Sequence, residues 1–261
     1  MIQRFNIDKI GISAVNLAVT IDAVKKAYAD GDIGYICVTN SRTCYIANRD
    51  EDYCRIQNDS LVTIPDGMPL VWIARLNGFK EVNRVSGIDL LRNLLGISTE
   101  NNFSHYFFGS KPETISLIEQ KLLQEYPSID IRGIVSPPFQ PIEKFNIQQI
   151  ADEINRLEPT FFWCGLGAPK QEFLISSLQP RLKNTICIGV GLAFDYFAGT
   201  VKRAPSWMRR NGLEGIYRLI QQPGRINYKS IIALSSIIPF ILKPLTRKIL
   251  FGSVGSKKHD N

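Results

Sequence analysis

The stretch TIPDGMPLVW (63–72) places one carboxylate, Asp66, between a β-branched run and an apolar restart. Asp-Gly is a common turn dipeptide, so Asp66 could serve only to shape a loop. At the carboxyl end of a strand in an open α/β sheet, however, a side chain faces the crevice where ligands bind. There a carboxylate can act as a general base while nearby cations stabilise an anionic leaving group. Asp66 is therefore the candidate catalytic residue, and turn formation is the alternative.

Arg84 is the candidate cation for this chemistry, and it lies in the stretch NRVSGIDLL (83–91). A short helical stretch separates it from Asp66, so the chain can return Arg84 to the same edge of the sheet. Other strand ends carry further groups that could contact a ligand at this edge. The groups predicted to bind substrate there are Thr39, Asn40, Gly109, Gly167, Lys170, Gln171 and Asp195.

Glycines at two strand ends could let backbone N–H groups approach an anion such as a diphosphate. They form G-x-G pairs at 165–167 and 189–191, but Lys170 and Phe194 occupy the third glycine position of a dinucleotide fingerprint. The chain also lacks a Walker A motif. Because incomplete patterns often mark structural turns, the two pairs indicate a nucleotide without specifying which.

Metal and histidine chemistry are weakly indicated. Asp50 and Asp52 form a D-x-D, which in some sugar transferases holds a metal on the donor diphosphate. Here the pair fits an acidic first helical turn, which the helix dipole favours. His105 begins a strand-like run and His259 lies near the end of the chain, and neither has the partners of a histidine triad. We therefore expect metal-independent chemistry.

Apolar strand-like runs alternate with helical spacing through most of the chain. The runs are 33–38, 61–64, 106–109, 129–134, 160–167 and 185–191. The stretches 112–126 and 146–157 repeat apolar residues at steps of three and four, which predicts helices. Near-continuous apolar strands between helices are typical of a parallel sheet covered on both faces. We predict an α/β, Rossmann-like doubly wound core with a mainly parallel sheet over residues 1–200.

Residues 201–261 are predicted to form a basic, helical appendage. Of the 31 Lys/Arg and 24 Asp/Glu residues, 12 and 2 lie in 202–261, which gives +10 there and −3 in the rest. This charge predicts an anionic partner for the appendage. Within it, the segment SIIALSSIIPFIL (230–242) carries no charge. As a helix it would be about 20 Å long, too short for about 30 Å of hydrocarbon.

We predict that the segment 230–242 lies in the interface of an anionic membrane, with its flanking lysines on headgroups. The alternative is a helix docked on the core with solvated charges. Nucleic acid is not expected as the anion, because the chain has no aromatic-interleaved basic sheet or recognition motif. The five cysteines include no C-x-x-C pair and the start of the chain has no signal-peptide pattern, so we expect a reducing, cytoplasmic compartment.

Five blocks of the chain together resemble the WecG/TagA/CpsF family of bacterial glycosyltransferases. They are PDGMPLVW (65–72), NRVSGIDLL (83–91), FFGSKP (107–112), GLGAPKQE (165–172) and GVGLAFDYFAGTVKRAPSWMRRNGLEGIYRLIQQPGR (189–225). The resemblance covers roughly residues 8–228, and the last block is the most specific in length and order.

The resemblance implies inverting transfer of a hexose or N-acetylhexosamine from a UDP-sugar to a polyprenyl-diphosphate-linked sugar. The sugar would be N-acetylmannosamine, its uronic acid or glucose, used for teichoic acid, common antigen or exopolysaccharide. The enzyme would act peripherally on the inner face of the bacterial membrane and need no metal or other cofactor. A homo-oligomer is compatible with the sequence. Two alternatives on the same fold are a nucleotide-dependent oxidoreductase and a non-catalytic, membrane-bound UDP-sugar sensor.

The resemblance also assigns roles to residues. It implies that Asp66 deprotonates the acceptor hydroxyl and that Asp195 contacts the uridine. The arginines Arg218 and Arg225 would close over the site and neutralise the departing UDP. The residues implied around donor and acceptor are Asn40, Arg84 and Gln171.

Overall fold

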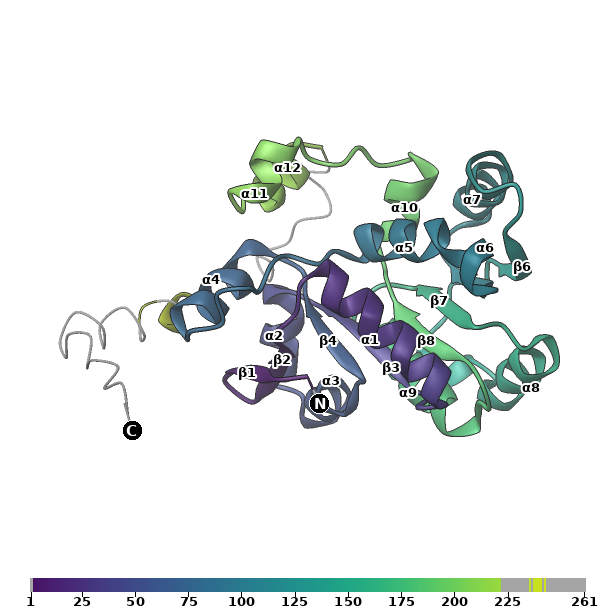
Figure 1. The fold of residues 1–261 in the computed structure, drawn as a ribbon, viewed down its shortest axis with the longest axis horizontal. Helices are drawn as coiled ribbons and strands as arrows, with labels where there is room; N and C mark the ends of the chain where they lie inside the picture. Colours follow the sequence, from purple (N-terminus) through teal and green to yellow (C-terminus); the bar gives the residue numbers. More distant parts are fainter. Residues whose placement is uncertain (1, 222–234, 236, 241, 243–261) are drawn as a thin grey trace, which may run out of the picture.

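Parallel strands form one sheet with helices on both faces (Figure 1) in the computed structural model, which describes residues 2–221, 235, 237–240 and 242. The strands in spatial order are β4 (Val62–Pro65), β3 (Tyr35–Thr39), β8 (Ile186–Gly189), β7 (Phe161–Gly165), β5 (Ser104–Gly109) and β6 (Asp130–Val135). All neighbouring strands run parallel. Each strand-like run of the sequence belongs to this sheet, so the predicted α/β doubly wound fold is confirmed.

Two layers of helices cover the sheet. One contains α1 (Leu17–Asp30), α5 (Gly87–Gly96), α6 (Ser98–Asn101), α7 (Pro112–Glu125) and α10 (Ala193–Ala198). The other contains α3 (Glu51–Asp59), α8 (Ile147–Leu157), α9 (Lys170–Leu178) and the short 3-10 helices η1 (Ile142–Lys144) and η2 (Gln179–Arg181). Along β7, Phe161 and Trp163 join the core of the first layer, whereas Phe162 joins the core of the second. Successive side chains point to opposite faces, so a continuous apolar strand needs cover on both.

A separate antiparallel hairpin, β1 (Arg4–Ile7) and β2 (Ile10–Ser13), was not predicted from the sequence. Its buried face joins α2 (Ser41–Ala47), α3 and α4 (Met68–Leu76) in a third apolar cluster. Each strand has only four residues, too few for its alternation to stand out from isolated apolar residues.

Two helices of the appendage, α11 (Ser206–Arg210) and α12 (Glu214–Gln221), lie outside the two layers and next to α4 (Figure 1). The turn between them packs on α4, because a Cβ added at Gly212 would lie 3.0 Å from the Trp72 ring. The predicted helical character after residue 200 is confirmed for these two helices. The division of the chain at residue 200 stays a prediction.

Most of the apolar segment 230–242 lies outside the described residues, so its placement in a membrane interface stays a prediction. Of the residues that are described, Ile237 is 2% exposed in the hairpin–α4 cluster, and Phe240 packs against that cluster. Ile238 and Leu242 are exposed. These contacts favour the docked-helix alternative for this part of the segment. In the described parts of the chain, no helix combines the length and apolarity needed to cross a membrane.

Three further sequence interpretations concern the D-x-D, the cysteines and His105. Asp50 is the N-cap of α3 and accepts from the backbone N–H of Tyr53 at 2.9 Å, which confirms that the D-x-D begins a helix. All five cysteines are free and buried. His105 is buried, and its Nδ1 accepts from Trp163 Nε1 at 2.9 Å. Its Nε2 therefore carries the proton toward Ser98 Oγ at 2.7 Å, and burial lowers the pKa of His105 to about 3.

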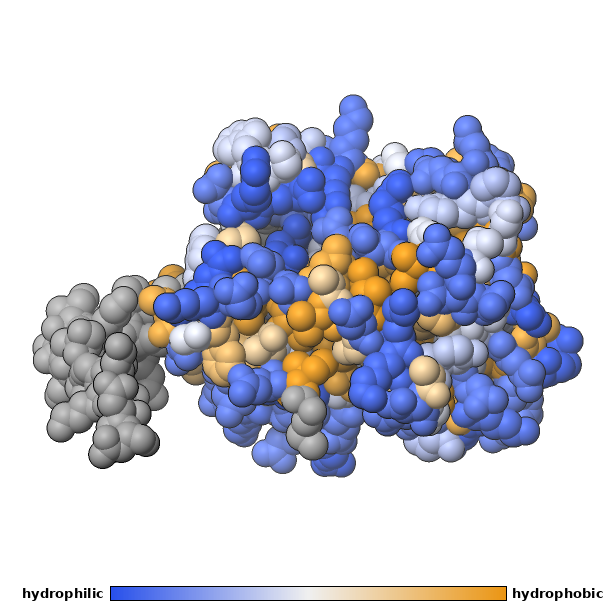
Figure 2. Space-filling model, in the orientation of Figure 1, coloured by the Kyte–Doolittle hydropathy of each residue, from blue (hydrophilic) through white to orange (hydrophobic). Residues whose placement is uncertain are grey.

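Figure 2 shows an apolar area near the middle of one face, in the region of α1, with polar side chains around it. Within helix α1, Val19 is 42% exposed. Apolar areas on a protein surface can mark an interface. The homo-oligomer that the sequence left open stays a prediction.

Candidate functional site

A cavity of about 890 Å³ opens at the carboxyl ends of the parallel strands. This volume lies within the range of small-molecule sites, and the place is where open α/β sheets bind ligands. Its walls come from the ends of the strands, from the segments that follow them and from the appendage. The predicted site residues that line it are Asn40, Asp66, Arg84, Gly167, Lys170, Gln171 and Asp195.

Asp66 follows β4, and its contacts bear on whether it serves only to shape the Asp-Gly turn. Gly67 is the N-cap of α4 and adopts φ +144°, a conformation that favours glycine, and no side chain caps this helix. The backbone N–H of Asp66 donates to Thr39 O at 2.7 Å, which ties the loop to the end of β3. The carboxylate lies 2.9 Å from Arg84 Nη2. Asp66 therefore takes part in an ion pair at the cavity in addition to its place in the turn.

Arg84 is shared by two carboxylates. Its Nη2 lies 2.9 Å from Asp66 Oδ1 and 2.6 Å from Glu214 Oε2. Tyr196 OH donates to the other oxygen of Glu214 at 3.2 Å. Burial alone would lower the pKa of Arg84, but Asp66 and Glu214 outweigh burial and raise it. The guanidinium thus stays charged and links the candidate base to helix α12.

A second ion pair fastens the start of the appendage to the core. Arg203 donates to both carboxylate oxygens of Asp89, at 2.6 and 2.5 Å, and to Ser86 Oγ at 2.9 Å. Burial would raise the pKa of Asp89, but the hydrogen bonds from Arg203 and Ser86 prevail and lower it. Ser86 is also the N-cap of α5 and lines the cavity, so the anchor lies beside the site.

Two predicted substrate-binding residues do not line the cavity. Thr39 is fully buried, and its hydroxyl donates to Gln57 Oε1 at 2.6 Å in the core. Gly109 adopts φ +126°, and a Cβ there would lie 2.7 Å from the backbone of Gly165. Both residues therefore contribute to the packing at the strand ends and do not line the cavity. Asn40 does line the cavity, and it caps α2 by accepting from two backbone N–H groups.

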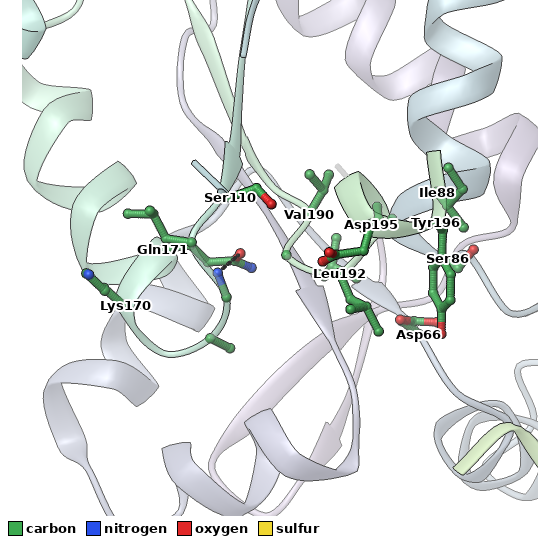
Figure 3. A pocket seen from close by; sticks show the side chains of 18 of the residues that line it. Asp66, Ser86, Ile88, Ser110, Lys170, Gln171, Val190, Leu192, Asp195 and Tyr196 are labelled. Atoms are coloured by element: carbon green, nitrogen blue, oxygen red, sulfur yellow. Dashed lines mark hydrogen bonds between the residues drawn. The ribbon is translucent and has the colours of Figure 1, made fainter. Parts of the chain in front are cut away.

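Figure 3 shows Lys170 and Gln171 on one side of the pocket, Asp66 and Tyr196 on the other, and Asp195 between them. The Lys170 ammonium donates to Gln140 O and lies over the rings of Phe139 and Phe145. The backbone N–H of Gly167 donates to Gln171 Oε1 at 3.1 Å. The glycine loops and the Lys170 cation thus lie on one wall of the cavity, where a positive charge suits an anion.

The sequence analysis missed several cavity residues. They are Arg42, Ser86, Ser110, Lys111, Ser136, Phe139, Tyr196 and Glu214. Glu214 had one usable signal: apart from Asp260 it is the only acid in the strongly basic stretch 202–261. A lone carboxylate in such a stretch invites a search for a cationic partner elsewhere in the chain.

Two of the predicted site residues are the appendage arginines Arg218 and Arg225. Arg218 lies in α12 with its side chain outside the described part of the structure, and Arg225 lies outside the described residues. Their closing role stays a prediction. Over the described parts of the chain, no three His, Cys, Asp or Glu side chains are grouped to hold a metal ion.

Comparisons with known proteins agree with this architecture. The model of the family described as "Glycosyl transferase WecG/TagA/CpsF family" matches residues 5–250. An N-acetylglucosaminyldiphosphoundecaprenol N-acetyl-beta-D-mannosaminyltransferase of Bacillus subtilis (strain 168) is 33% identical over 94% of this chain and 93% of its own length. Proteins of the same name from Bacillus spizizenii and Staphylococcus aureus (strain NCTC 8325) are 27% and 26% identical. These two alignments cover 85% and 92% of this chain, and 84% and 94% of the relatives.

Proposed function

The chain belongs to the WecG/TagA/CpsF family of glycosyltransferases, and on this basis we propose that it transfers N-acetylmannosamine or a related hexose from a UDP-sugar to a polyprenyl-diphosphate-linked sugar. The names of the curated relatives support a lipid-linked N-acetylglucosamine acceptor and an N-acetylmannosamine donor group. Membership of a glycosyltransferase family argues against the alternative of a nucleotide-dependent oxidoreductase. The product would enter a cell-envelope polysaccharide such as a teichoic acid.

The observation that carries this proposal is the Asp66–Arg84 contact of 2.9 Å at the mouth of the cavity. Asp66 takes the proton of the acceptor hydroxyl as that oxygen bonds to the anomeric carbon. The bond from this carbon to the UDP oxygen breaks at the same time, and UDP leaves with the electron pair. A single displacement inverts the anomeric centre and needs one base, so one carboxylate suffices.

The opposite wall suits the diphosphate. Gly167 and Gly191 have φ +81° and +51°, which bring backbone close to the cavity, and Lys170 adds a cation beside them. Backbone N–H groups and a cation stabilise the charge that develops on a leaving diphosphate. We assign uridine contact to Asp195, and closure over UDP to Arg218 and Arg225.

Membrane association follows from the acceptor. A polyprenyl lipid stays in the bilayer, so the enzyme must work at the membrane surface. The basic appendage supports binding to anionic headgroups on the inner face of the membrane. Its docked helices α11 and α12 would bring that surface next to the cavity.

The test is UDP release from a panel of UDP-sugars, with short-chain polyprenyl-diphosphate-N-acetylglucosamine as the acceptor and EDTA present. Acceptor-dependent release with one donor identifies the donor and shows that no added metal is required. UDP binding without release from any donor supports the sensor alternative. A chain that binds neither UDP nor any UDP-sugar contradicts the proposal.

A further inference from the structure

Directly beneath the cavity wall lies a carboxyl group that the proposed reaction does not use. Glu172, the neighbour of Gln171 in the first turn of α9, is 0% exposed. A buried charge normally requires a partner, because transfer out of water is costly. Within the described residues, no Lys or Arg lies close enough to Glu172 to form an ion pair.

The hydrogen bonds of the Glu172 carboxyl group lead to the cavity. Gln171 Nε2 donates to Glu172 Oε1 at 2.8 Å. The other Gln171 amide atom, Oε1, accepts from the backbone N–H of Gly167 at 3.1 Å. One amide therefore connects the buried carboxyl group to the glycine loop after β7.

The same amide packs against the second glycine loop. A Cβ added at Gly189 would lie 2.9 Å from Gln171 Nε2, and one at Gly191 would lie 3.3 Å from Oε1. The two incomplete G-x-G patterns of the sequence thus meet at one side chain. Both loops line the cavity, so the orientation of this amide affects the wall proposed to receive the diphosphate.

An amide can be turned over, which exchanges its donor and its acceptor. With Glu172 ionised, turning Gln171 over would point Oε1 at the carboxylate and Nε2 at the N–H of Gly167. An acceptor would then face an acceptor at the carboxylate, and a donor would face a donor at Gly167. A carboxylate only accepts hydrogen bonds, so it selects the orientation observed.

We propose that Glu172 is a positioning residue whose carboxylate orients the Gln171 amide and thereby holds the Gly167 loop ready for the donor diphosphate. The proposal rests on the proposed function, since it assigns the diphosphate to this loop. Glu172 itself touches no substrate.

The protonation state of Glu172 offers a specific readout. Burial raises its pKa to about 7, opposed by the hydrogen bond from Gln171, the nearby Tyr53 hydroxyl and the charge of Arg42. These groups come from α9, α3 and α2, and the thiols of Cys37 in β3 and Cys164 in β7 also face it. A protonated carboxyl group can donate as well as accept, so the preference for one amide orientation weakens as the pH falls through 7.

The experiment measures UDP affinity by calorimetry between pH 5.5 and 8.5 for the full chain and for Glu172→Gln. We expect the wild-type protein to lose about 10-fold more affinity below pH 7 than the variant does. The phosphate of UDP titrates near pH 6 as well, but it affects both proteins alike. The matched control is Glu153→Gln, because Glu153 on α8 also lies beside a tyrosine hydroxyl and accepts from Tyr106 OH at 2.8 Å. This control is expected to keep the wild-type profile.

A second variant covers the case in which Glu172→Gln does not fold. Tyr53→Phe removes a hydroxyl that lowers the pKa of Glu172, so the wild-type midpoint should move to higher pH. Superimposable profiles of the wild type and the variants overturn the positioning role while leaving the transferase intact. Failure of the wild-type protein to bind UDP overturns the proposed function and the positioning role together.

Discussion

Arg84 donates to the carboxylate of Glu214 at 2.6 Å, although 130 positions separate these two residues in the chain. The contact joins a core loop to α12 of the appendage. Because the same guanidinium holds Asp66 at 2.9 Å, docking of the appendage and alignment of the candidate base depend on one another. A sugar transferase with this arrangement would assemble its site only when the appendage is in place.

Glu214→Gln is expected to weaken this docking. The substitution removes a charge-assisted hydrogen bond in a part-buried place, where such a bond contributes about 1–3 kcal/mol. We predict a fall in kcat of about 10-fold and faster proteolytic cleavage between the core and α12. The control is Glu125→Gln, whose partner Arg92 lies 2.9 Å away in a more exposed pair worth under about 1 kcal/mol. Equal proteolysis of the two variants would contradict the coupling.

Asp66→Asn is expected to lower kcat by about 10²–10⁴-fold, the usual contribution of a general base. Asparagine keeps the shape of the side chain but cannot take the acceptor proton. UDP affinity should stay close to wild type, whereas stability should fall by about 1–3 kcal/mol because the charge-assisted contact with Arg84 is lost. Turnover assays measure kcat, UDP calorimetry measures the affinity, and thermal unfolding measures the stability. The control is Asp30→Asn, which lies in an exposed ion pair. Wild-type turnover in Asp66→Asn would show that another group acts as the base.

Gly189→Ala is expected to impair substrate binding more than folding. Its Cβ would lie 2.9 Å from Gln171 Nε2, a side-chain atom that can shift. Displacing that amide should raise KM for the UDP-sugar about 10-fold. Gly96→Ala is the matched control, since a Cβ there meets nothing within 4 Å, and we expect it to be neutral or to stabilise by about 0.5–1 kcal/mol. An unchanged KM in Gly189→Ala would show that the position of Gln171 does not affect donor binding.

Glu172→Gln should change how stability depends on pH. Glu172 has an ordinary pKa of 4.5 when unfolded and about 7 in the folded protein. Between these values the unfolded state has lost a proton that the folded state keeps, so the wild type becomes less stable as the pH rises. The loss reaches at most about 3 kcal/mol above pH 7 and is absent in the variant. Thermal unfolding at pH 5 and pH 8 should therefore show the variant gaining stability relative to wild type, and parallel curves would contradict the raised pKa.

The sequence by itself determined the sheet and the edge at which the cavity lies. Apolar runs and steps of three and four are local properties, so they predicted β3 to β8 as well as helices α7 and α8. The glycine pairs and Asp66 could be assigned to strand ends for the same reason. The basic appendage was evident from charge alone, because net charge needs no fold to be counted.

Only the tertiary structure decided which of these groups meet. Neighbouring strands such as β3 and β8 are far apart in the chain, and packing sets the direction of each side chain. Local spacing therefore could not reveal that Thr39 turns into the core, or that Gln171 touches both glycine loops. Nor could it pair Glu214 with Arg84, because a contact across 130 positions exists only after the appendage has docked on the folded sheet.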